Sequence, residues 1–473
     1  MKRNYLFYPV IIGIFGLMIW FVIAQGEKLV PENVATQVSE NMVPAANEPG
    51  ILQELTSHMR LPLSMLLVQI VLILGVSRLF GALARKIKQP AVVGEILAGI
   101  LLGPSLFGMI WPEGMNAIFP KSSLSSLQFL SQIGLAFFMF IVGMELDVEK
   151  IRNKAHDAVM ISHASIVVPF FLGVTLAYFI YQHYAPANVG FLAFSLFMGI
   201  AMSITAFPVL ARIVQERKLT GTPLGTLAIT CAAADDVTAW CILAAVVAIA
   251  QAGSILGALV TIGLSAIFVV GMLYIIKPWL RKRMVKQPEY GEKMSQRHVA
   301  LAFFTLLIAG YIAEIIGIHM LFGAFLAGVI MPSEMNIKQL LTDKLEDVSI
   351  LILLPIFFAF TGLRTQIGLL NEGHLWVVFG FIMLVAVGGK FGGSTLSARL
   401  VGQPWSDAIS IGALMNTRGL MELVVLNIGY DLGILTPQIF AMMVLMALAT
   451  TFMTGPILDA INYAARRKAA VAV

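Results

Sequence analysis

Long apolar runs, separated by short polar segments, follow one another along almost the whole chain from Leu61 onward. Most runs are long enough for an α-helix to cross the hydrocarbon core of a bilayer, which takes about 20 residues. The sequence predicts an all-α polytopic membrane protein with about thirteen spanning helices after an N-terminal helix. The run at 319–332 is short and is counted because the topology and an internal repeat require it. The predicted spans are 61–85, 89–111, 124–146, 158–183, 189–214, 225–252, 254–277, 295–318, 319–332, 349–370, 374–402, 406–433 and 436–463.

The segment 1–26 begins with two basic residues, which are followed by an apolar run at 8–24. This pattern is typical of a signal peptide, with residues 22–24 as the cleavage site, or of an uncleaved signal anchor. The length of the run favours the anchor, and both interpretations place the N-terminus in the cytoplasm. Residues 27–60 are polar and contain three prolines, which predicts an extracytoplasmic linker.

Composition and charge agree with this class of protein. The chain is 59% hydrophobic and 12% charged, about half the charged share of a soluble domain. A β-barrel would show alternating segments of about ten residues. The net charge of +5 does not indicate nucleic-acid binding, because the basic residues lie in short loops between spans.

Basic residues gather in the loops on one side of the predicted membrane. If the span 61–85 begins outside, this side is the cytoplasm, as the positive-inside rule requires. We expect a multi-pass protein of the plasma (inner) membrane, surrounded by lipid, with a cytoplasmic C-terminus. The outer loops keep only Lys28, Arg60 and Lys121, whereas the inner loops hold Arg85, Lys86, Lys88, Lys150, Arg152, Lys154, Arg212, Arg217, Lys218, Lys277, Arg281, Lys282, Arg283, Lys286, Lys293, Arg297, Lys338, Lys344, Arg399, Arg466, Arg467 and Lys468.

Two motifs occur twice along the chain. The segment Gly94–Gly99 (GEILAG) resembles Gly323–Gly328 (GAFLAG), and Phe137–Gly143 resembles Phe357–Gly362. Each matching pair runs in opposite directions in the predicted topology. Inverted repeats are typical of secondary transporters, whose ion sites lie near the midplane where the repeats meet. The transmembrane domain at 61–468 then consists of repeat one at 61–252, a linking helix at 254–277 and repeat two at 295–463.

Two adjacent carboxylates, Asp235 and Asp236, lie near the middle of the predicted span 225–252. An ionisable side chain at this depth costs at least about 2.5 kcal/mol, and two neighbouring negative charges also repel each other. Apolar packing gains nothing from such a pair. The pair therefore predicts a site that takes up and releases a proton or a monovalent cation. Structural aspartates in salt bridges between helices are the alternative.

The fifth predicted span contains Ser203, Thr205 and Pro208 within six residues. Proline removes a backbone hydrogen bond and clashes with the preceding turn, and the two hydroxyl groups lie close to the freed carbonyls. The pattern predicts a broken helix that aims carbonyl and hydroxyl oxygens at a central ion. An ordinary proline kink is the alternative.

The twelfth span, which the repeat pairs with the fifth, contains Asn416-Thr417-Arg418-Gly419 and then Glu422. Polar residues and a glycine again interrupt an apolar helix, which predicts a second broken helix. A local pair between Arg418 and Glu422, one helical turn apart, is the alternative. We expect Arg418 to shape the site.

Lys390 supplies a counter-charge at membrane depth in the eleventh span, where glycines stand on both sides of it. Such glycines let a neighbouring helix approach closely. A charged lysine at this depth needs an opposing acid, so we expect it to pair with Asp235 or Asp236. Snorkelling of the side chain to the inner surface is the alternative.

Three further acids, Glu95, Glu145 and Glu314, fall within or at the ends of spans. We expect Glu145 to pair locally near the inner surface. We expect Glu314 to be the most buried of the three, with a role either in proton access or in a structural contact.

Together these motifs resemble the monovalent cation:proton antiporter-2 family, and especially its branch that includes the plant cation/proton exchangers. The similarity covers about Leu61 to the C-terminus. The segments that carry it are Thr205–Pro208 (TAFP), Asp235–Trp240 (DDVTAW), Asn416–Leu423 (NTRGLMEL), Gly94–Gly99 (GEILAG) and Gly143–Asp147 (GMELD).

The resemblance implies an inverted-repeat antiporter fold with a dimerisation bundle and a mobile core bundle, usually assembled as a homodimer. The core bundle would hold spans four to six and eleven to thirteen. By position in the motif, Asp236 would carry the cation and the proton, and Asp235 would pair with Lys390. Relatives with Asn in place of the first Asp are typically electroneutral, so the Asp-Asp form implies electrogenic exchange. Many potassium-efflux relatives carry a nucleotide-binding domain after the last span; this sequence stops at Val473, and we expect no such domain.

The expected function is exchange of Na⁺ or K⁺ for protons by alternating access, without a cofactor. One carboxylate, that of Asp236, cannot hold a proton and a cation at once, and Thr205 and Ser203 would complete the oxygen shell. A cation channel or uniporter on the same fold is the alternative. An intramembrane aspartyl protease needs aspartates on separate helices, whereas Asp235 and Asp236 are adjacent and point in different directions. We therefore expect no enzyme and no nucleic-acid partner.

Overall fold

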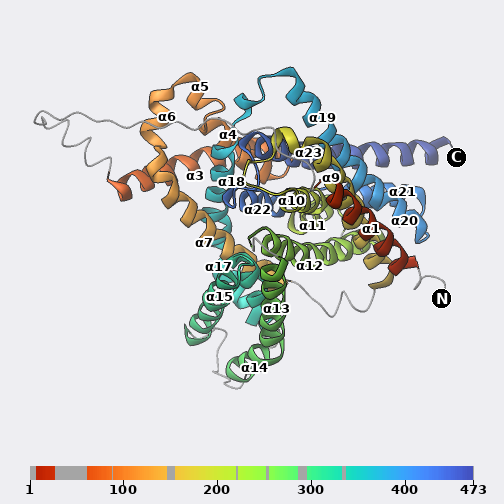
Figure 1. Ribbon diagram of the computed structural model, residues 1–473, viewed down its shortest axis with the longest axis horizontal. Helices are drawn as coiled ribbons and strands as arrows, with labels where there is room; N and C mark the ends of the chain where they lie inside the picture. The colour runs from red at the N-terminus through yellow and green to blue at the C-terminus, as the bar shows by residue number, and fades with distance from the viewer. Residues whose placement is uncertain are drawn as a thin grey trace, which may run out of the picture.

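The computed structural model describes residues 7–26, 61–87, 89–145, 155–219, 222–251, 255–285, 296–332 and 337–471. Within these residues the chain is helical and has no β-strand (Figure 1). The predicted linker at 27–60 lies outside the described residues. The helices up to the linking helix are α1 (Phe7–Gly26), α3 (Pro62–Lys86), α4 (Ala91–Leu102), α5 (Phe107–Ile110), α6 (Pro112–Ile118), α7 (Lys121–Glu145), α9 (Ala155–Tyr184), α10 (Phe191–Ser203), α11 (Phe207–Glu216) and α12 (Pro223–Gln251).

The second half of the chain is also helical, but π-helical turns and one 3₁₀ turn interrupt it. A π-helical turn inside an α-helix often lies at a functional site. The elements are α13 (Ile255–Gly271), η1 (Met272–Ile276), α14 (Lys277–Val285), α15 (Gln296–Ile316), α16 (Met320–Val329), α17 (Ile337–Val348), η3 (Ser349–Leu353), α18 (Leu354–Arg364), η4 (Ile367–Leu369), α19 (Gly373–Val387), η5 (Gly388–Gly392), α20 (Gly393–Leu400), α21 (Trp405–Met415), α22 (Leu420–Asp431) and α23 (Pro437–Val471).

Ten helices in the described part of the chain are long and apolar enough to cross a membrane. The pair α21 and α22 makes an eleventh span, bent by 40° at its break. The two other predicted spans correspond to shorter elements, since 189–214 is the pair α10 and α11, and 319–332 is the short α16. The predicted count of thirteen is therefore reached only when these shorter elements are included.

Three predicted spans are parts of longer helices, because a helix does not stop where its apolar run stops. The linking helix, predicted at 254–277, continues through η1 into α14 and ends at Val285. The tenth span was expected from 349, but α17 begins at Ile337, and the thirteenth was expected to end at 463, but α23 reaches Val471. The added turns are rich in charged residues. Their backbone bonds are closed within the helix, so they can continue into water.

The helices pack as two bundles. The scaffold bundle consists of α3, α4, α7 and α15 to α18, and the core bundle of α9 to α12 and α19 to α23. In Figure 1 the scaffold bundle occupies the left and lower part and the core bundle the right. This division places predicted spans four to six and eleven to thirteen in one bundle, as the resemblance implied. Helix α1 packs along α9, and the rings of Phe15 and Phe171 meet edge to face at 5.4 Å.

The repeated glycine motifs make reciprocal contacts between the two repeats. A Cβ atom on Gly99 of α4 would collide with the backbone of Ala359 in α18, and one on Gly328 of α16 would collide with the backbone of Phe140 in α7. Each glycine-rich helix thus packs against the phenylalanine-rich helix of the other repeat. This reciprocity is what a two-fold relation between inverted repeats produces, and only glycine allows helices to approach so closely.

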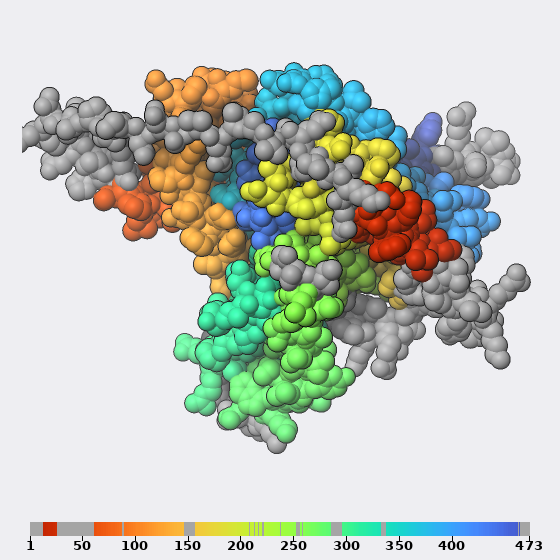
Figure 2. All heavy atoms as spheres, viewed as in Figure 1, coloured from red at the N-terminus to blue at the C-terminus, as the bar shows by residue number. Residues whose placement is uncertain are grey.

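Helices α13, α14 and α15 form a lobe that projects from the rest of the molecule (Figure 2). The apolar side chains of α13 are largely exposed there; Leu259 is 61% and Ile267 69% exposed. An exposed apolar band of this extent fits a lipid-facing helix. The projecting lobe contains the linking helix between the repeats, and Lys277, Lys282 and Arg283 extend that helix at its far end.

Candidate functional site

Asp235 and Asp236 lie in the middle of α12, and both are fully or almost fully buried. Successive helical residues point about 100° apart, so the two carboxylates meet different neighbours. Asp235 faces α9, from which the hydroxyl of Ser165 donates a hydrogen bond of 2.8 Å and that of Ser162 a longer one of 3.5 Å. The carboxylate of Asp235 also forms an ion pair of 2.8 Å with Lys390.

Lys390 reaches this position from η5, a π-helical turn between α19 and α20. A Cβ atom on the neighbouring Gly389 would lie 2.9 Å from the Cα atom of Pro169 in α9, so glycine is needed for the close approach of the two helices. The ammonium group of Lys390 donates to the carboxylate of Asp235, to the carbonyl of Ser165 at 3.1 Å and to the carbonyl of Ser203. The lysine therefore points into the core bundle and does not snorkel to the surface.

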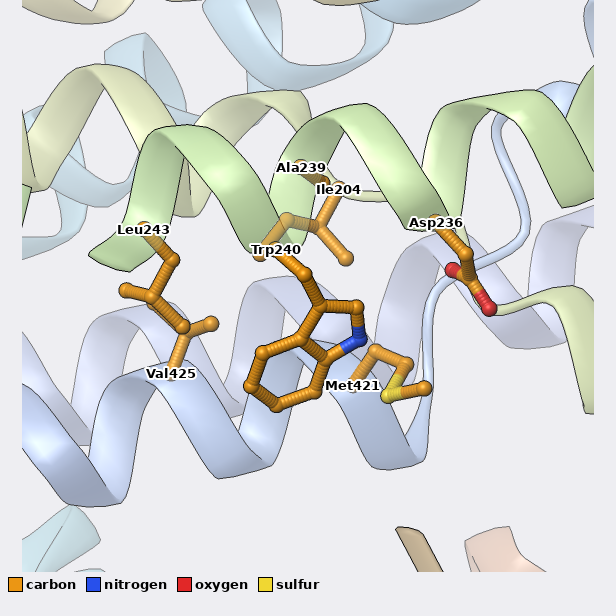
Figure 3. A pocket seen from close by; sticks show the side chains of 7 residues that line it. All are labelled: Ile204, Asp236, Ala239, Trp240, Leu243, Met421 and Val425. Atoms are coloured by element: carbon orange, nitrogen blue, oxygen red, sulfur yellow. The ribbon is translucent and has the colours of Figure 1, made fainter. Parts of the chain in front are cut away.

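Asp236 has a contrasting environment. It is 2% exposed, and neither of its carboxylate oxygens has a hydrogen-bond partner among the described residues. A small cavity, with room for about one water molecule, opens beside it between α12 and α22 (Figure 3). The other residues that line the cavity are Ile204, Ala239, Trp240, Leu243, Met421 and Val425.

The first predicted break is present. Helix α10 ends at Ser203 and α11 begins at Phe207, and Ile204 between them is extended, with φ −77° and ψ 136°. Pro208 lies in the first turn of α11. The N–H groups of a first turn have no acceptor within the helix, so a proline there costs no hydrogen bond. The side chain of Pro208 lies outside the described residues. The hydroxyl of Thr205 donates to the carbonyl of Met415 in α21 at 3.1 Å.

The second break separates α21 from α22 at residues 416–419, directly against the first. The backbone N–H of Ala206 donates to the carbonyl of Thr417 at 3.0 Å, so the two interruptions are joined by a backbone hydrogen bond. A Cβ atom on Gly419 would lie 2.9 Å from a methyl carbon of Val209 in α11, which explains the glycine. The side chain of Asn416 is buried, and its amide has no hydrogen-bond partner in the described part of the chain.

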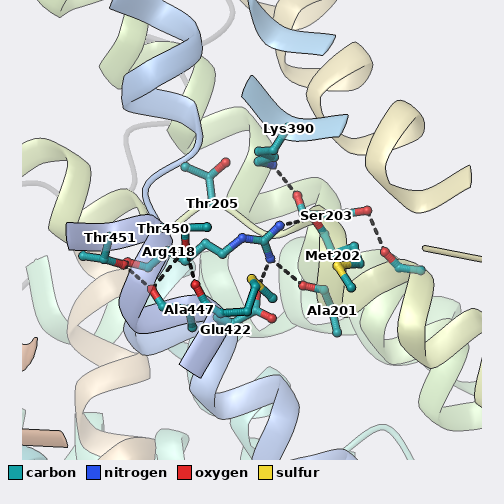
Figure 4. A network of polar contacts seen from close by, with 12 residues as sticks. Ala201, Met202, Ser203, Thr205, Lys390, Arg418, Glu422, Ala447, Thr450 and Thr451 are labelled. Carbon is teal, nitrogen blue, oxygen red and sulfur yellow. Dashed lines mark hydrogen bonds and ion pairs between the residues drawn. The ribbon is translucent and has the colours of Figure 1, made fainter. Parts of the chain in front are cut away.

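The break in α10 leaves the last carbonyls of that helix without intrahelical partners. Two buried cations satisfy them (Figure 4). Arg418 donates to the carbonyls of Ala201 at 2.8 Å and Met202 at 2.6 Å, and Lys390 donates to the carbonyl of Ser203. Positive charge is favourable at the C-terminal end of a helix dipole. The two basic side chains therefore hold the broken end of α10 inside the membrane domain.

Arg418 also pairs with Glu422, one turn along the chain, at 2.8 Å. The predicted local pair and the predicted break thus exist together. The fully buried charged residues among those described are two cations, Lys390 and Arg418, and three acids. Their formal sum is +2 − 3 = −1, so one negative charge has no cationic partner. The third acid, left over after the two ion pairs, is Asp236.

Sequence reasoning did not identify Ser162 and Ser165 as partners of the site. Their signal was present, since they lie three residues apart and therefore on one face of an apolar helix. The expected burial of Glu314 was wrong, because it is exposed. The structural contact that was its other expected role is present: the carboxylate accepts the backbone N–H of Met320, at the start of α16, at 2.7 Å. Glu145, at the end of α7, is also exposed.

Comparisons with known proteins agree with this geometry. A family model described as the transmembrane sodium/hydrogen exchanger matches residues 71–461. The Na⁺/H⁺ antiporter NhaS4 of Synechocystis sp. is 42% identical over 398 residues, which cover 84% of this chain and 96% of that protein. Cation/H⁺ antiporter 19 of Arabidopsis thaliana is 41% identical over 410 residues, 86% of this chain and 51% of the relative. The K⁺/H⁺ antiporter 1 of Saccharomyces cerevisiae is 34% identical over 403 residues, 84% and 46% of the two chains.

The chain thus spans almost all of the Synechocystis protein but about half the length of the plant and yeast relatives. Among solved structures, the sodium proton antiporter MjNhaP1 of Methanocaldococcus jannaschii superposes with a TM-score of 0.64 at 14% identity, over 85% of this chain and 98% of that one. This likeness shows the antiporter fold. From the family match and the identity of the relatives, the chain belongs to the transmembrane sodium/hydrogen exchanger family.

Proposed function

We propose that this protein exchanges a monovalent cation for protons by alternating access, with the carboxylate of Asp236 as the group that binds either one. The observation that carries the proposal is the surroundings of Asp236. It is a buried carboxylate without a hydrogen-bond partner among the described residues, beside a small cavity and next to two helix breaks. An unpaired buried charge is costly, so such a site favours uptake of one positive charge.

Oxygen atoms near the breaks would complete the shell around the cation. Thr205 and Ser203 donate their hydroxyl protons to backbone carbonyls, which leaves the lone pairs of both oxygens free to face an ion. The amide oxygen of Asn416, which has no hydrogen-bond partner among the described residues, is a further candidate. Oxygen ligands of this kind suit alkali cations, which lack a preference for nitrogen or sulfur.

The charge sum makes a proton and a cation mutually exclusive at Asp236. One added positive charge neutralises the five buried charged groups, and a second would recreate an imbalance. Electrogenic exchange needs a second proton, which Lys390 of the Asp235–Lys390 pair would release when the cation binds and take up again when the cation leaves. The salt bridge between them would reform when the cation leaves and would help the site to reset.

The names of the relatives indicate which cations to consider as substrates. The Synechocystis relative is a Na⁺/H⁺ antiporter and the yeast relative a K⁺/H⁺ antiporter, so Na⁺ and K⁺ are the substrates we propose. We further propose a homodimer in the plasma membrane with a cytoplasmic C-terminus. Helix α1 would be a retained anchor, because its residues Ile19, Val22 and Ile23 pack against the core of the molecule.

The test is proton efflux from acid-loaded everted vesicles, followed with a pH-sensitive dye on addition of Na⁺, K⁺, Li⁺ or choline. Wild type is compared with Asp236→Asn and with Asp407→Asn, a change of the same kind in the first turn of α21. We expect a cation-specific response in wild type and Asp407→Asn and only the background of empty vesicles in Asp236→Asn. Exchange retained in a folded Asp236→Asn protein would contradict the assignment, and currents without proton coupling would indicate a channel.

A further inference from the structure

The core and scaffold bundles share a largely apolar contact, and one part of it is strongly polar. It lies where the end of α18, in the scaffold bundle, meets α22, in the core bundle. Three side chains, Arg364, Asn427 and Asp431, join the two helices there. They stand at the ends of α18 and α22 that the positive-inside rule assigns to the exterior.

Arg364 is the centre of this contact. Its guanidinium group donates to the carboxylate of Asp431 at 2.6 Å and to the amide oxygen of Asn427 at 3.3 Å. The same group lies over the rings of Phe360 at 4.3 Å and Tyr430 at 5.3 Å. The side chains of Arg364 and Asp431 are 16% and 24% exposed. A partly desolvated, multiply bonded arginine of this kind contributes more than an isolated surface pair.

Asn427 adds a second tie between the bundles. Its amide N–H₂ group donates to the hydroxyl of Thr361 in α18 at 2.8 Å and to the carbonyl of Leu423 in its own helix. Asn427 is buried, so these bonds cannot be replaced by water without a change in packing. The two helices are therefore joined by specific hydrogen bonds as well as by charge.

The helix held in this way is the one that borders the ion site. Helix α22 begins at the second break, and its residues Met421 and Val425 line the cavity beside Asp236. Any movement of the core bundle against the scaffold bundle displaces α22 from α18. A movement that parts the outer ends of the two bundles separates Arg364 from Asp431, because the two residues belong to different bundles.

We propose that Arg364, Asn427 and Asp431 form an inter-bundle clamp, which keeps the outer side of the ion site closed in this conformation and opens once in each exchange cycle. The inference rests on the proposed alternating access, to which it adds positioning residues far from the carboxylate that binds the cation. The clamp joins two rigid bundles at one end, so its release lets that end separate while the other end stays packed.

The structure offers a matched control for the test. Arg217, at the end of α11, forms the same kind of ion pair with Asp459 of α23, but both residues lie in the core bundle. The two cysteines among the described residues, Cys231 and Cys241, are first replaced by alanine. Cysteine pairs are then placed at Arg364 and Asp431 in one variant and at Arg217 and Asp459 in the other. A short bifunctional methanethiosulfonate joins each pair, and a reductant releases it.

We expect cross-linking of the Arg364→Cys/Asp431→Cys pair to stop cation-dependent proton exchange and reduction to restore it, within one protein sample. Cross-linking of the Arg217→Cys/Asp459→Cys pair should leave exchange unchanged. Exchange that continues in the fully cross-linked clamp variant overturns the clamp but leaves the assignment of Asp236 intact. Loss of exchange in both cross-linked variants overturns it too, because the effect would then not depend on joining the two bundles.

A second measurement applies if the clamp variant has no exchange before cross-linking. Val425→Cys places a thiol in the cavity beside Asp236, and its labelling by a membrane-impermeant reagent from outside reports access to the site. We expect Arg364→Gln to raise the labelling rate several-fold, whereas Arg217→Gln should not change it. An unchanged rate in Arg364→Gln overturns the proposal.

Discussion

Asp235 and Asp236 are neighbours in the sequence and both are buried, yet they differ in their hydrogen-bond partners. Asp235 accepts hydrogen bonds from two serines of α9 and pairs with Lys390. Asp236 has no hydrogen-bond partner in the described part of the chain and borders a cavity. A carboxylate with a full set of partners holds helices together, whereas one without them is available to an ion. We propose that this difference separates a structural acid, Asp235, from the acid that binds the transported ion, Asp236.

The same division extends to the two broken helices. The carbonyls at the end of α10 are occupied by Arg418 and Lys390, so that helix end is fixed by charge. At the second break the side-chain amide of Asn416 has no partner among the described residues. Charged groups therefore fix the broken helices in place, and we propose that neutral oxygen atoms at the breaks help to bind the ion.

The largest expected effect is on the stability of the protein, through the buried contacts of Arg418. Arg418→Met leaves two buried carbonyls and the carboxylate of Glu422 without a donor, so the free energy of unfolding should fall by about 4 kcal/mol. Thermal unfolding of the purified protein, followed by tryptophan fluorescence, measures the loss. Arg418→Lys should restore part of it, because lysine keeps the charge but lacks the planar fork of arginine. Equal stability of wild type and Arg418→Met would show that the caps of α10 are not structural.

The direct test of the comparison is a matched pair of substitutions. Asp235→Asn removes the partner of a buried lysine and should lower the free energy of unfolding by about 3 kcal/mol. Asp236→Asn replaces an unpartnered carboxylate and should leave stability unchanged or increase it. Both variants are unfolded under the same conditions as wild type. If the two substitutions destabilise the protein equally, the distinction between the two acids is wrong.

The smallest expected effect concerns the oxygen shell. Thr205→Val keeps the shape of the side chain but removes the bond to Met415, at a cost of about 1 kcal/mol in stability. If the same oxygen binds the cation, the KM for that cation should also rise by roughly fivefold, which corresponds to about 1 kcal/mol. Thr450→Val is the control, because its hydroxyl bonds only to carbonyls of its own helix. Similar KM values in the two variants would remove Thr205 from the shell.

Hydrophobic patterning predicted the helices well because each run of apolar residues carries its own signal. The breaks were also readable, since proline, glycine and buried polar residues are incompatible with an uninterrupted apolar helix. The sequence pattern did not predict where α14 and α23 end or where α17 begins. The turns at these ends are polar, and only the neighbouring chain segments decide whether such turns are helical. Glu314 was misplaced for a related reason: burial depends on what packs against a helix.

The sequence by itself determined which residues could not be explained by apolar packing: the two aspartates, Lys390, and the polar residues at the breaks. It also determined the reciprocal glycine motifs, because close helix contact excludes any larger side chain. The family resemblance implied that Asp235 pairs with Lys390, and the structure shows this ion pair. Only the tertiary structure decided that Arg418 caps α10 and that Arg364 joins α18 to Asp431 of α22. These contacts join residues far apart in the sequence and depend on how each helix is rotated about its axis, which follows from the packing of all the helices together.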